Sequence, residues 1–304
     1  MADFRFPKRR ANQLYVDTWL PEETLAIREE IRDFAEKELA PVAHRINTTV
    51  ESKDSFPWEM LKKIGDAGIY RIPFPKEQGG RGLQYPVLAS QVVEEELAYF
   101  SNSVAAALYD APMALLGASL LRFGSKELLD RYLPKLMTGE ITASFATSEP
   151  LASTDLSVKS LSTVATRVEG GYRVNGVKRW ITNACVADFL LFLCKVDNKL
   201  TMLLTDMNVE GISVSEPDKK MGNLGQLTSE ITFKDVFVPA KNLLATEGGG
   251  LKVALSALTE GRIAVGSMSV GLAQAAFDHA ADFMERRKGF GRELARMQHW
   301  QNIF

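Results

Sequence analysis

Trp180 and Thr182 are the residues whose types and spacing first suggest chemistry. They lie in the stretch GYRVNGVKRWITNA, directly after a strand-like run that turns at Asn175-Gly176. A surface hairpin would carry charges where this sequence places Trp, Ile and Thr in succession. One interpretation is an aromatic wall and a hydroxyl that face a ligand. The alternative is a Trp that closes one end of a β-barrel, beside a Thr that serves only as a strand former.

Other kinds of site find little support in the sequence. The two cysteines, Cys185 and Cys194, match no zinc or redox spacing and predict buried thiols in a reducing compartment. The three histidines, His44, His279 and His299, are far apart, so neither a metal site nor a Ser-His-Asp triad is expected. No G-x-G-x-x-G follows a strand and no Walker sequence occurs, which argues against a Rossmann or P-loop nucleotide site.

The composition is that of an ordinary soluble protein. Of 304 residues, 46% are apolar and 24% charged, and 36 basic against 38 acidic side chains leave a formal net charge of −2. Such a balance creates no strong field for nucleic acid or an anionic membrane. No apolar run reaches spanning length, and the N-terminus lacks a signal-type apolar core, so no membrane span and a cytoplasmic location are expected.

The elements that must position Trp180 and Thr182 fall into three regions, which together predict an α+β multidomain fold. Residues 1–140 read as an N-terminal α-helical domain, in which Pro21 starts a helix and Pro41 stops or kinks it. Residues 141–245 contain short β-type runs separated by turn signals, typical of a compact all-β unit. Residues 246–304 begin a C-terminal helical bundle.

A long helix is expected from Leu251 to about Arg287. Gly261, Gly266 and Gly271 lie inside it, and each costs about 1 kcal/mol relative to Ala in a helix interior. Two explanations remain open at this point: close packing against another helix, or a ligand that approaches the backbone.

Three segments together resemble the acyl-CoA dehydrogenase family. They are SFATSEPLASTD (144–155), NGVKRWITNA (175–184) and ERRKGFGRELARMQ (285–298), and with the stretches around them the resemblance covers almost the whole chain. It implies FAD as the cofactor and an acyl-CoA thioester as the substrate. It also implies a helical N-terminal domain, a β-barrel-like middle domain and a C-terminal helical bundle that forms tetramers or dimers of dimers.

The resemblance also assigns residues to the cofactor. It places Trp180 beside the flavin ring and the Thr182 hydroxyl near flavin N5 and O4, a pairing that suits a flat π-system with hydrogen-bonding ring atoms. Arg287 would meet the pyrophosphate of a neighbouring subunit's FAD, although a basic residue at a helix end is also ordinary. The full cofactor-binding set is Phe145, Thr147, Ser148, Thr154, Trp180, Ile181, Thr182, Arg287, Phe290 and Gln298.

Thr154, Thr259 and Arg262 match positions on the substrate side. The sequence departs from the family pattern nearby, because Leu151-Ala152-Ser153 replaces a Gly-rich turn and Ala184 replaces a Gly. Since Leu151 adopts a positive φ only at a cost, substrate approach at this turn is expected to differ from the family.

No residue of the chain is assigned as the catalytic base. In most family members a Glu late in the C-terminal bundle, beyond Phe304, removes the proton; in a minority it precedes the Arg of the long helix, where Gly261 stands here. Glu260 lies about 100° around the helix from that direction, so we interpret it as a solvated or interface carboxylate. These features indicate the short-chain-like branch, with a C-terminus shortened relative to the family.

The main functional prediction is therefore an acyl-CoA dehydrogenase that forms trans-2-enoyl-CoA and passes electrons to an electron-transfer flavoprotein. Two alternatives stay open. The chain could be a non-catalytic, FAD-holding partner subunit, or a relative of the same fold that uses O2, such as an acyl-CoA oxidase or flavin monooxygenase.

Overall fold

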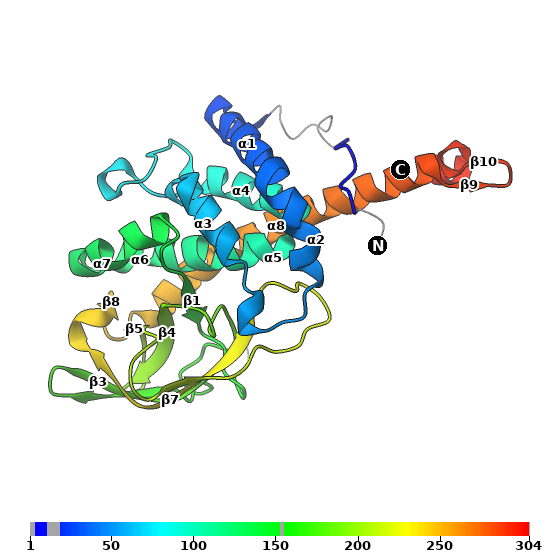
Figure 1. Cartoon of the computed structure of the whole chain (residues 1–304). Helices are drawn as coiled ribbons and strands as arrows, with labels where there is room; N and C mark the ends of the chain where they lie inside the picture. Colours follow the sequence, from blue (N-terminus) through cyan, green and yellow to red (C-terminus); the bar gives the residue numbers. More distant parts are fainter. Residues whose placement is uncertain (1–3, 11–18, 153–154, 304) are drawn as a thin grey trace.

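The computed structural model describes residues 4–10, 19–152 and 155–303 of the chain. A block of helices lies on one side of a β-sheet, and one long helix runs from the sheet across the helical block and projects beyond it (Figure 1). The predicted α+β fold, with helical, β and helical regions in that order, is confirmed.

The N-terminal block consists mainly of helices. Its α-helices are α1 (Glu22–Phe34), α2 (Ala40–Thr48), α3 (Trp58–Asp66), α4 (Pro86–Phe100), α5 (Asn102–Val104), α6 (Ala118–Phe123) and α7 (Lys126–Met137). Two π-helical stretches are η3 (Ala35–Leu39) and η7 (Ala105–Gly117), and three 3₁₀ turns are η4 (Lys53–Ser55), η5 (Ile69–Arg71) and η6 (Lys76–Gln78).

Pro41 does not stop the first helical run, which was one of the two predicted outcomes. It occupies the first turn of α2, where a missing N–H and a fixed φ are tolerated, and the π-helical η3 connects α1 to α2.

The sequence also predicted no span of membrane length, but the stretch Asn102–Phe123 has the length and hydropathy of one. Because 78% of its apolar window is buried inside the protein, it has the character of a core helix.

The middle region is a single mixed sheet. Its strands are β1 (Ala143–Ala146), β2 (Val164–Val168), β3 (Gly171–Thr182), β4 (Phe189–Val196), β5 (Lys199–Asp206), β6 (Ile212–Val214), β7 (Thr228–Pro239) and β8 (Leu243–Leu244), with the 3₁₀ turn η8 (Ala240–Asn242) before β8. The strand order is β6-β7-β3-β2-β4-β5-β8, and β1 runs parallel to β4.

Strand β4 connects the two hydrophobic cores because its side chains alternate between the faces of the sheet. Leu191 and Leu193 belong to the core shared with the helices, whereas Leu190 and Phe192 belong to the core on the other face. A strand buried on both faces explains why its first six residues are all apolar.

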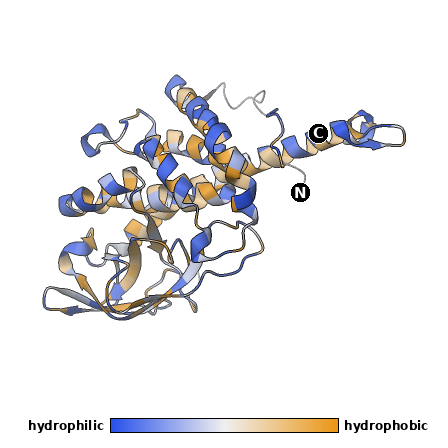
Figure 2. Cartoon of the chain, viewed as in Figure 1, coloured by the Kyte–Doolittle hydropathy of each residue, from blue (hydrophilic) through white to orange (hydrophobic). Residues whose placement is uncertain are grey.

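The long helix α8 spans Gly250–Arg286 and packs along α4. A Cβ at Gly271 would lie 2.1 Å from the carbonyl oxygen of Glu95, and one at Gly261 would lie 2.7 Å from Cδ2 of Leu115. Close packing therefore accounts for these two glycines, while Gly266 faces open space. The projecting part of α8 carries hydrophobic and hydrophilic residues in alternation (Figure 2).

The chain after α8 forms a small hairpin and two short helical turns. These elements are β9 (Lys288–Gly289), β10 (Arg292–Glu293), the 3₁₀ turn η9 (Leu294–Arg296) and α9 (Gln298–Gln301).

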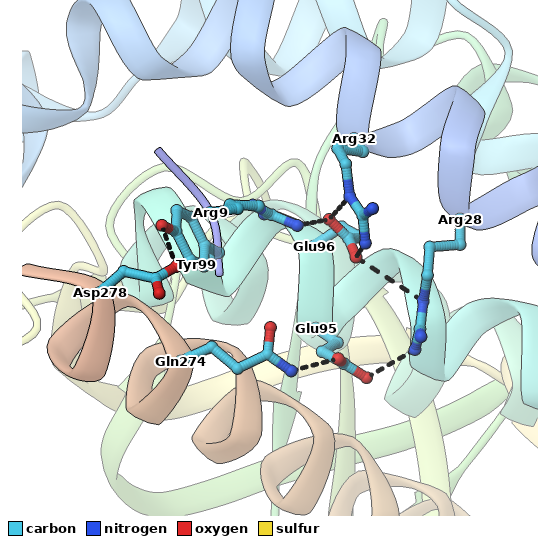
Figure 3. Close-up of polar contacts among 8 residues, drawn as sticks. All are labelled: Arg9, Arg28, Arg32, Glu95, Glu96, Tyr99, Gln274 and Asp278. Carbon is cyan, nitrogen blue, oxygen red and sulfur yellow. Dashed lines mark hydrogen bonds and ion pairs between the residues drawn. The ribbon is translucent and has the colours of Figure 1, made fainter. Parts of the chain in front are cut away.

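A polar network joins the N-terminal arm, α1, α4 and α8 (Figure 3). Buried Glu96 receives Arg9 from the arm and both Arg28 and Arg32 from α1, the last at 2.9 Å. The other bonds drawn are Arg28 to Glu95 at 3.0 Å, Gln274 to Glu95 at 2.8 Å and Tyr99 to Asp278 at 2.8 Å. Ion pairs thus join the arm and α1 to α4, and hydrogen bonds of Gln274 and Asp278 join α8 to α4.

Candidate functional site

Trp180 has an unusual backbone and an exposed ring. Its φ is 58°, and the pairing of β3 with β7 shifts register between Lys178 and Ile181, so Trp180 stands in a β-bulge. A positive φ is rare and costly for a bulky residue, and such strain is concentrated at functional sites. Trp180 is 53% exposed, which favours a residue that faces a ligand over one that closes the end of a barrel. Ile181 is buried in the sheet core, which leaves only its backbone for a ligand.

The predicted segment around β1 lies directly against the end of β3. Ser144 Oγ donates to the carbonyl oxygen of Thr182 at 2.7 Å, and the Arg179 amide donates to the carbonyl of Ser148 at 3.0 Å. The structure therefore brings the stretch with Phe145, Thr147 and Ser148 beside the stretch with Trp180 and Thr182.

An ion pair beneath this junction fixes both segments. Lys178 Nζ, which is fully buried, donates to Glu149 Oε1 at 2.8 Å and to the carbonyl of Thr147 at 3.2 Å. Glu149 also accepts from the backbone amides of Ser162 and Thr163. Burial raises the pKa of Glu149, but the Lys178 charge and these hydrogen bonds outweigh it and lower that pKa to about 2. Glu149 is a supporting residue that the sequence analysis did not assign.

Thr182 is oriented by a residue that sequence reasoning missed. Gln226 Nε2 donates to Thr182 Oγ1 at 3.0 Å, which leaves the hydroxyl proton of Thr182 able to donate to a ligand. Gln226 lies in the connection between β6 and β7, 44 residues away, and no local motif marks it.

Asn183 joins this site to the helical block. Its Nδ2 donates to the carbonyl of Ala107 in η7 at 2.6 Å, and its φ is 63°, which Asn tolerates better than most residues. Ala184 and Leu151 have no positive φ, so neither of these two residues is strained, whereas Ser153 of the replaced turn lies outside the described residues. Thr154 lies outside the described residues.

The predicted substrate residues of α8 are on its exposed face. Thr259 donates its hydroxyl to the carbonyl of Leu255 at 2.8 Å, and Arg262 is exposed. Glu260 pairs with Arg122 of α6, in agreement with its interpretation as an interface carboxylate.

Arg287, Phe290 and Gln298 are exposed at the far end of α8 and in the segment after it. Phe290 is fully exposed and has a φ of 51°. Within one chain the structure does not bring them to Trp180, because α8 runs away from the sheet toward them (Figure 1). Their prediction as contacts to a neighbouring subunit's cofactor remains a prediction.

The residues gathered at Trp180 fit a flavin. An exposed aromatic face, an oriented hydroxyl and the backbone that follows β1 form a donor set that suits a flat, hydrogen-bonding ring system. A hollow of about 570 Å³ lies elsewhere, beside Lys53 and Arg131, and is not lined by Trp180 or Thr182.

The two cysteines differ in burial. Cys194 is buried, and burial raises the pKa of its thiol to about 12. Cys185 is only half-buried, so the prediction of two buried thiols holds for one. Among the described residues, no group of three or more His, Cys, Asp or Glu side chains could hold a metal ion.

Comparison with known proteins gives matches to three domain families over most of the chain. Residues 21–140, 144–236 and 248–303 match the acyl-CoA dehydrogenase N-terminal, middle and C-terminal domains. The short-chain specific acyl-CoA dehydrogenase of Clostridium acetobutylicum is 33% identical over 288 residues, which are 93% of this chain and 74% of that protein.

Two further similar proteins are a subunit of an Etf complex and a dehydrogenase of solved structure. The caffeyl-CoA reductase-Etf complex subunit CarC of Acetobacterium woodii is 35% identical over 285 residues, 92% of this chain and 73% of that protein. The structure of butyryl-CoA dehydrogenase from Megasphaera elsdenii is 30% identical, superposes with a TM-score of 0.84, and is matched over 93% of this chain and 74% of that one.

Proposed function

Because this chain belongs to the acyl-CoA dehydrogenase family of FAD-dependent oxidoreductases, we propose that it desaturates an acyl-CoA thioester to the trans-2-enoyl-CoA. The observation that carries the proposal is the strained, exposed Trp180 in its bulge, next to a Thr182 hydroxyl that Gln226 orients. Both residues are held against the segment after β1 that the family resemblance assigns to the cofactor.

The chain's own residues would hold and shield the reacting groups. When bound, FAD supplies the acceptor for the hydride that leaves Cβ of the substrate. Trp180 would cover the ring and exclude water, and the Thr182 hydroxyl would donate a hydrogen bond at its edge. The Lys178–Glu149 pair would keep the segment of Thr147 and Ser148 in position. A carboxylate must remove the Cα proton, and none of the described residues is assigned to that role.

The finer parts of the proposal rest on the relatives. A short-chain acyl group is supported by the short-chain specific relative and by the butyryl-CoA dehydrogenase structure. An electron-transfer flavoprotein as the acceptor is supported by the relative that is a subunit of an Etf complex. We further propose a homotetramer, in which Arg287, Phe290 and Gln298 reach the FAD of a neighbour, and a cytoplasmic location.

Absorbance spectroscopy of the flavin-loaded protein tests this function. Anaerobic addition of butyryl-CoA should bleach the flavin band, and an electron-transfer flavoprotein should restore it. A bound flavin that no acyl-CoA bleaches would contradict the proposal and favour a non-catalytic subunit. Reoxidation by air as fast as by the flavoprotein would favour an oxidase or monooxygenase.

A further inference from the structure

Two carboxyl groups are buried together in the helical block. Glu94 of α4 is fully buried and Asp110 of η7 is 9% exposed. Burial raises the pKa of both, and the Asp110 charge adds to the effect on Glu94; the pKa of Asp110 rises to about 7. Carboxyl groups are almost never fully buried unless they are paired, so this arrangement calls for an explanation.

Three oxygens of the pair have no partner among the described residues. They are Glu94 Oε1, Glu94 Oε2 and Asp110 Oδ1. The nearby hydroxyls already donate elsewhere, since Tyr109 donates to Ser90 Oγ and Ser90 to the carbonyl of Pro86. A buried acceptor without a donor destabilises the folded state by about 1–3 kcal/mol, and by more when it is charged. Three such oxygens should therefore lower the stability of the fold substantially.

The pair lies between the candidate site and α8. A Cβ at Gly261 would be 3.9 Å from Asp110 Oδ1, so Asp110 faces the part of α8 that carries the predicted substrate residues Thr259 and Arg262. In the other direction, Asp110 is three residues along η7 from Ala107, whose carbonyl accepts the hydrogen bond from Asn183.

A small hollow lies along the same two elements, about one helical turn from the pair, although neither Glu94 nor Asp110 lines it. Its volume is about 120 Å³, and its lining includes Ser90 and Gln91, three to four residues before Glu94, and Met113 and Ala114, three to four residues after Asp110. Arg122 and Glu260 also line the hollow, so it provides space one turn away from the carboxyl groups and not at the carboxyl groups themselves.

We propose that Glu94 and Asp110 form an acceptor subsite for a protonated amine at the distal end of the acyl group. This inference rests on the proposed acyl-CoA dehydrogenase function and specifies its substrate class. An ammonium group has three N–H donors and one positive charge, which match three unpartnered oxygens on an acidic pair. A substrate with a terminal carboxylate brings no N–H donor to these oxygens, and an alkyl end would leave them without donors.

Matched ligands of equal length test the subsite by calorimetric binding to the flavin-loaded protein at pH 7. The short pair is 3-aminopropanoyl-CoA with butyryl-CoA, and the long pair is 6-aminohexanoyl-CoA with heptanoyl-CoA. We expect the amine of at least one pair to bind ten times or more tighter than its alkyl partner. The preference should fall below about threefold in Asp110→Asn and Glu94→Gln, and should persist in the control Glu29→Gln, which changes an exposed carboxylate of α1.

The outcomes distinguish a failure of the amine subsite from a failure of the proposed dehydrogenase function. If alkyl thioesters bind but the amines bind no tighter, or if the preference survives both variants, the subsite is overturned and the dehydrogenase function stands. If no acyl-CoA of any kind binds, both fail. In a last experiment, the unfolding temperature is measured in ammonium chloride and in potassium chloride at equal ionic strength. If these salts raise the unfolding temperature of the wild type but not that of Asp110→Asn, a free cation occupies the pair and the acyl-amine proposal is overturned.

Discussion

Lys178 Nζ lies 2.8 Å from Glu149 Oε1, and both side chains are inaccessible to water. The pair connects the middle of β3 to the segment that follows β1, the two stretches that meet at the candidate cofactor site.

Replacement of Lys178 by Met should lower the free energy of unfolding by about 3–5 kcal/mol. The reason is that Glu149 would remain buried without its cation. Denaturant unfolding measures this loss, and flavin affinity should fall with it. The control is Lys135→Met, which breaks an exposed pair with Glu140 and should change stability by less than about 1 kcal/mol. Equal effects of the two variants would contradict the buried role of Lys178.

Acid should weaken the fold through Glu149. Since its folded pKa of about 2 is below the ordinary value of 4.5, the folded protein binds fewer protons on this group than the unfolded chain. The resulting stability, on the order of 3 kcal/mol, is fully present above pH 4.5 and is lost as the pH falls toward 2. Denaturant titrations at pH 6 and pH 3 should show the loss in the wild type and a smaller loss in Glu149→Gln.

Asp110 should make the free energy of unfolding fall as the pH rises, which is opposite to the effect of Glu149 and occurs at higher pH. Its pKa is raised from 3.8 to about 7, so between these values the folded protein binds more protons and stability falls as the pH rises. Asp110→Asn should therefore gain stability relative to the wild type from pH 4.5 to pH 8, by about 1–3 kcal/mol. A constant difference between the two proteins across this range would show that Asp110 is not buried as described.

Trp180 should matter more for the ligand than for the fold. Trp180→Gly removes an exposed ring and permits the positive φ without strain, so we expect stability to change by less than about 1 kcal/mol. Flavin affinity should fall tenfold or more, as measured by titration of the apoprotein with FAD. A variant that unfolds readily, or that binds FAD normally, would rule out the ring-covering role.

Two glycines of α8 offer a matched comparison of packing. Gly271→Ala would place its Cβ 2.1 Å from the Glu95 carbonyl oxygen and force α4 and α8 apart, at a cost of about 2 kcal/mol or more. Gly266→Ala meets no atom within 4 Å and should stabilise the helix by up to about 1 kcal/mol. Thermal unfolding of both variants checks the opposite signs.

Periodicity and turn residues were sufficient to predict the order of helices and strands, because those signals are local. The apolar run at the start of β4 is an example. The turn predicted at Asn175-Gly176 is wrong, because both residues lie inside β3, where the pairing with β7 shifts register instead. The π-helical stretch η7 was predicted simply as helix, since no local pattern separates the two forms.

The candidate site was predictable only in part. The motif around Trp180 marked the ring and the hydroxyl, but the bulge that exposes the ring depends on pairing with β7. Gln226 and Asn183 act across 44 and 76 residues respectively, which no window of sequence can show. Asp110 is visible in the sequence as a single acidic residue in the apolar run VAAALYDAPMALLG. Such a residue indicates a buried carboxyl group with a specific role.

Helix α8 begins against the sheet, where a Cβ at Gly250 would collide with the backbone of Thr201, and extends 37 residues, or about 55 Å. In a helix of that length, a small change of direction at the N-terminal end causes a large displacement at the C-terminal end. A tilt of α8 by about 5° moves its C-terminal end by about 5 Å. Arg10 of the N-terminal arm binds Asp278 and Glu285 near the C-terminal end of α8, and these contacts limit the displacement. Accurate placement of Arg287 and Phe290 then depends on a few residues at the opposite end of the sequence.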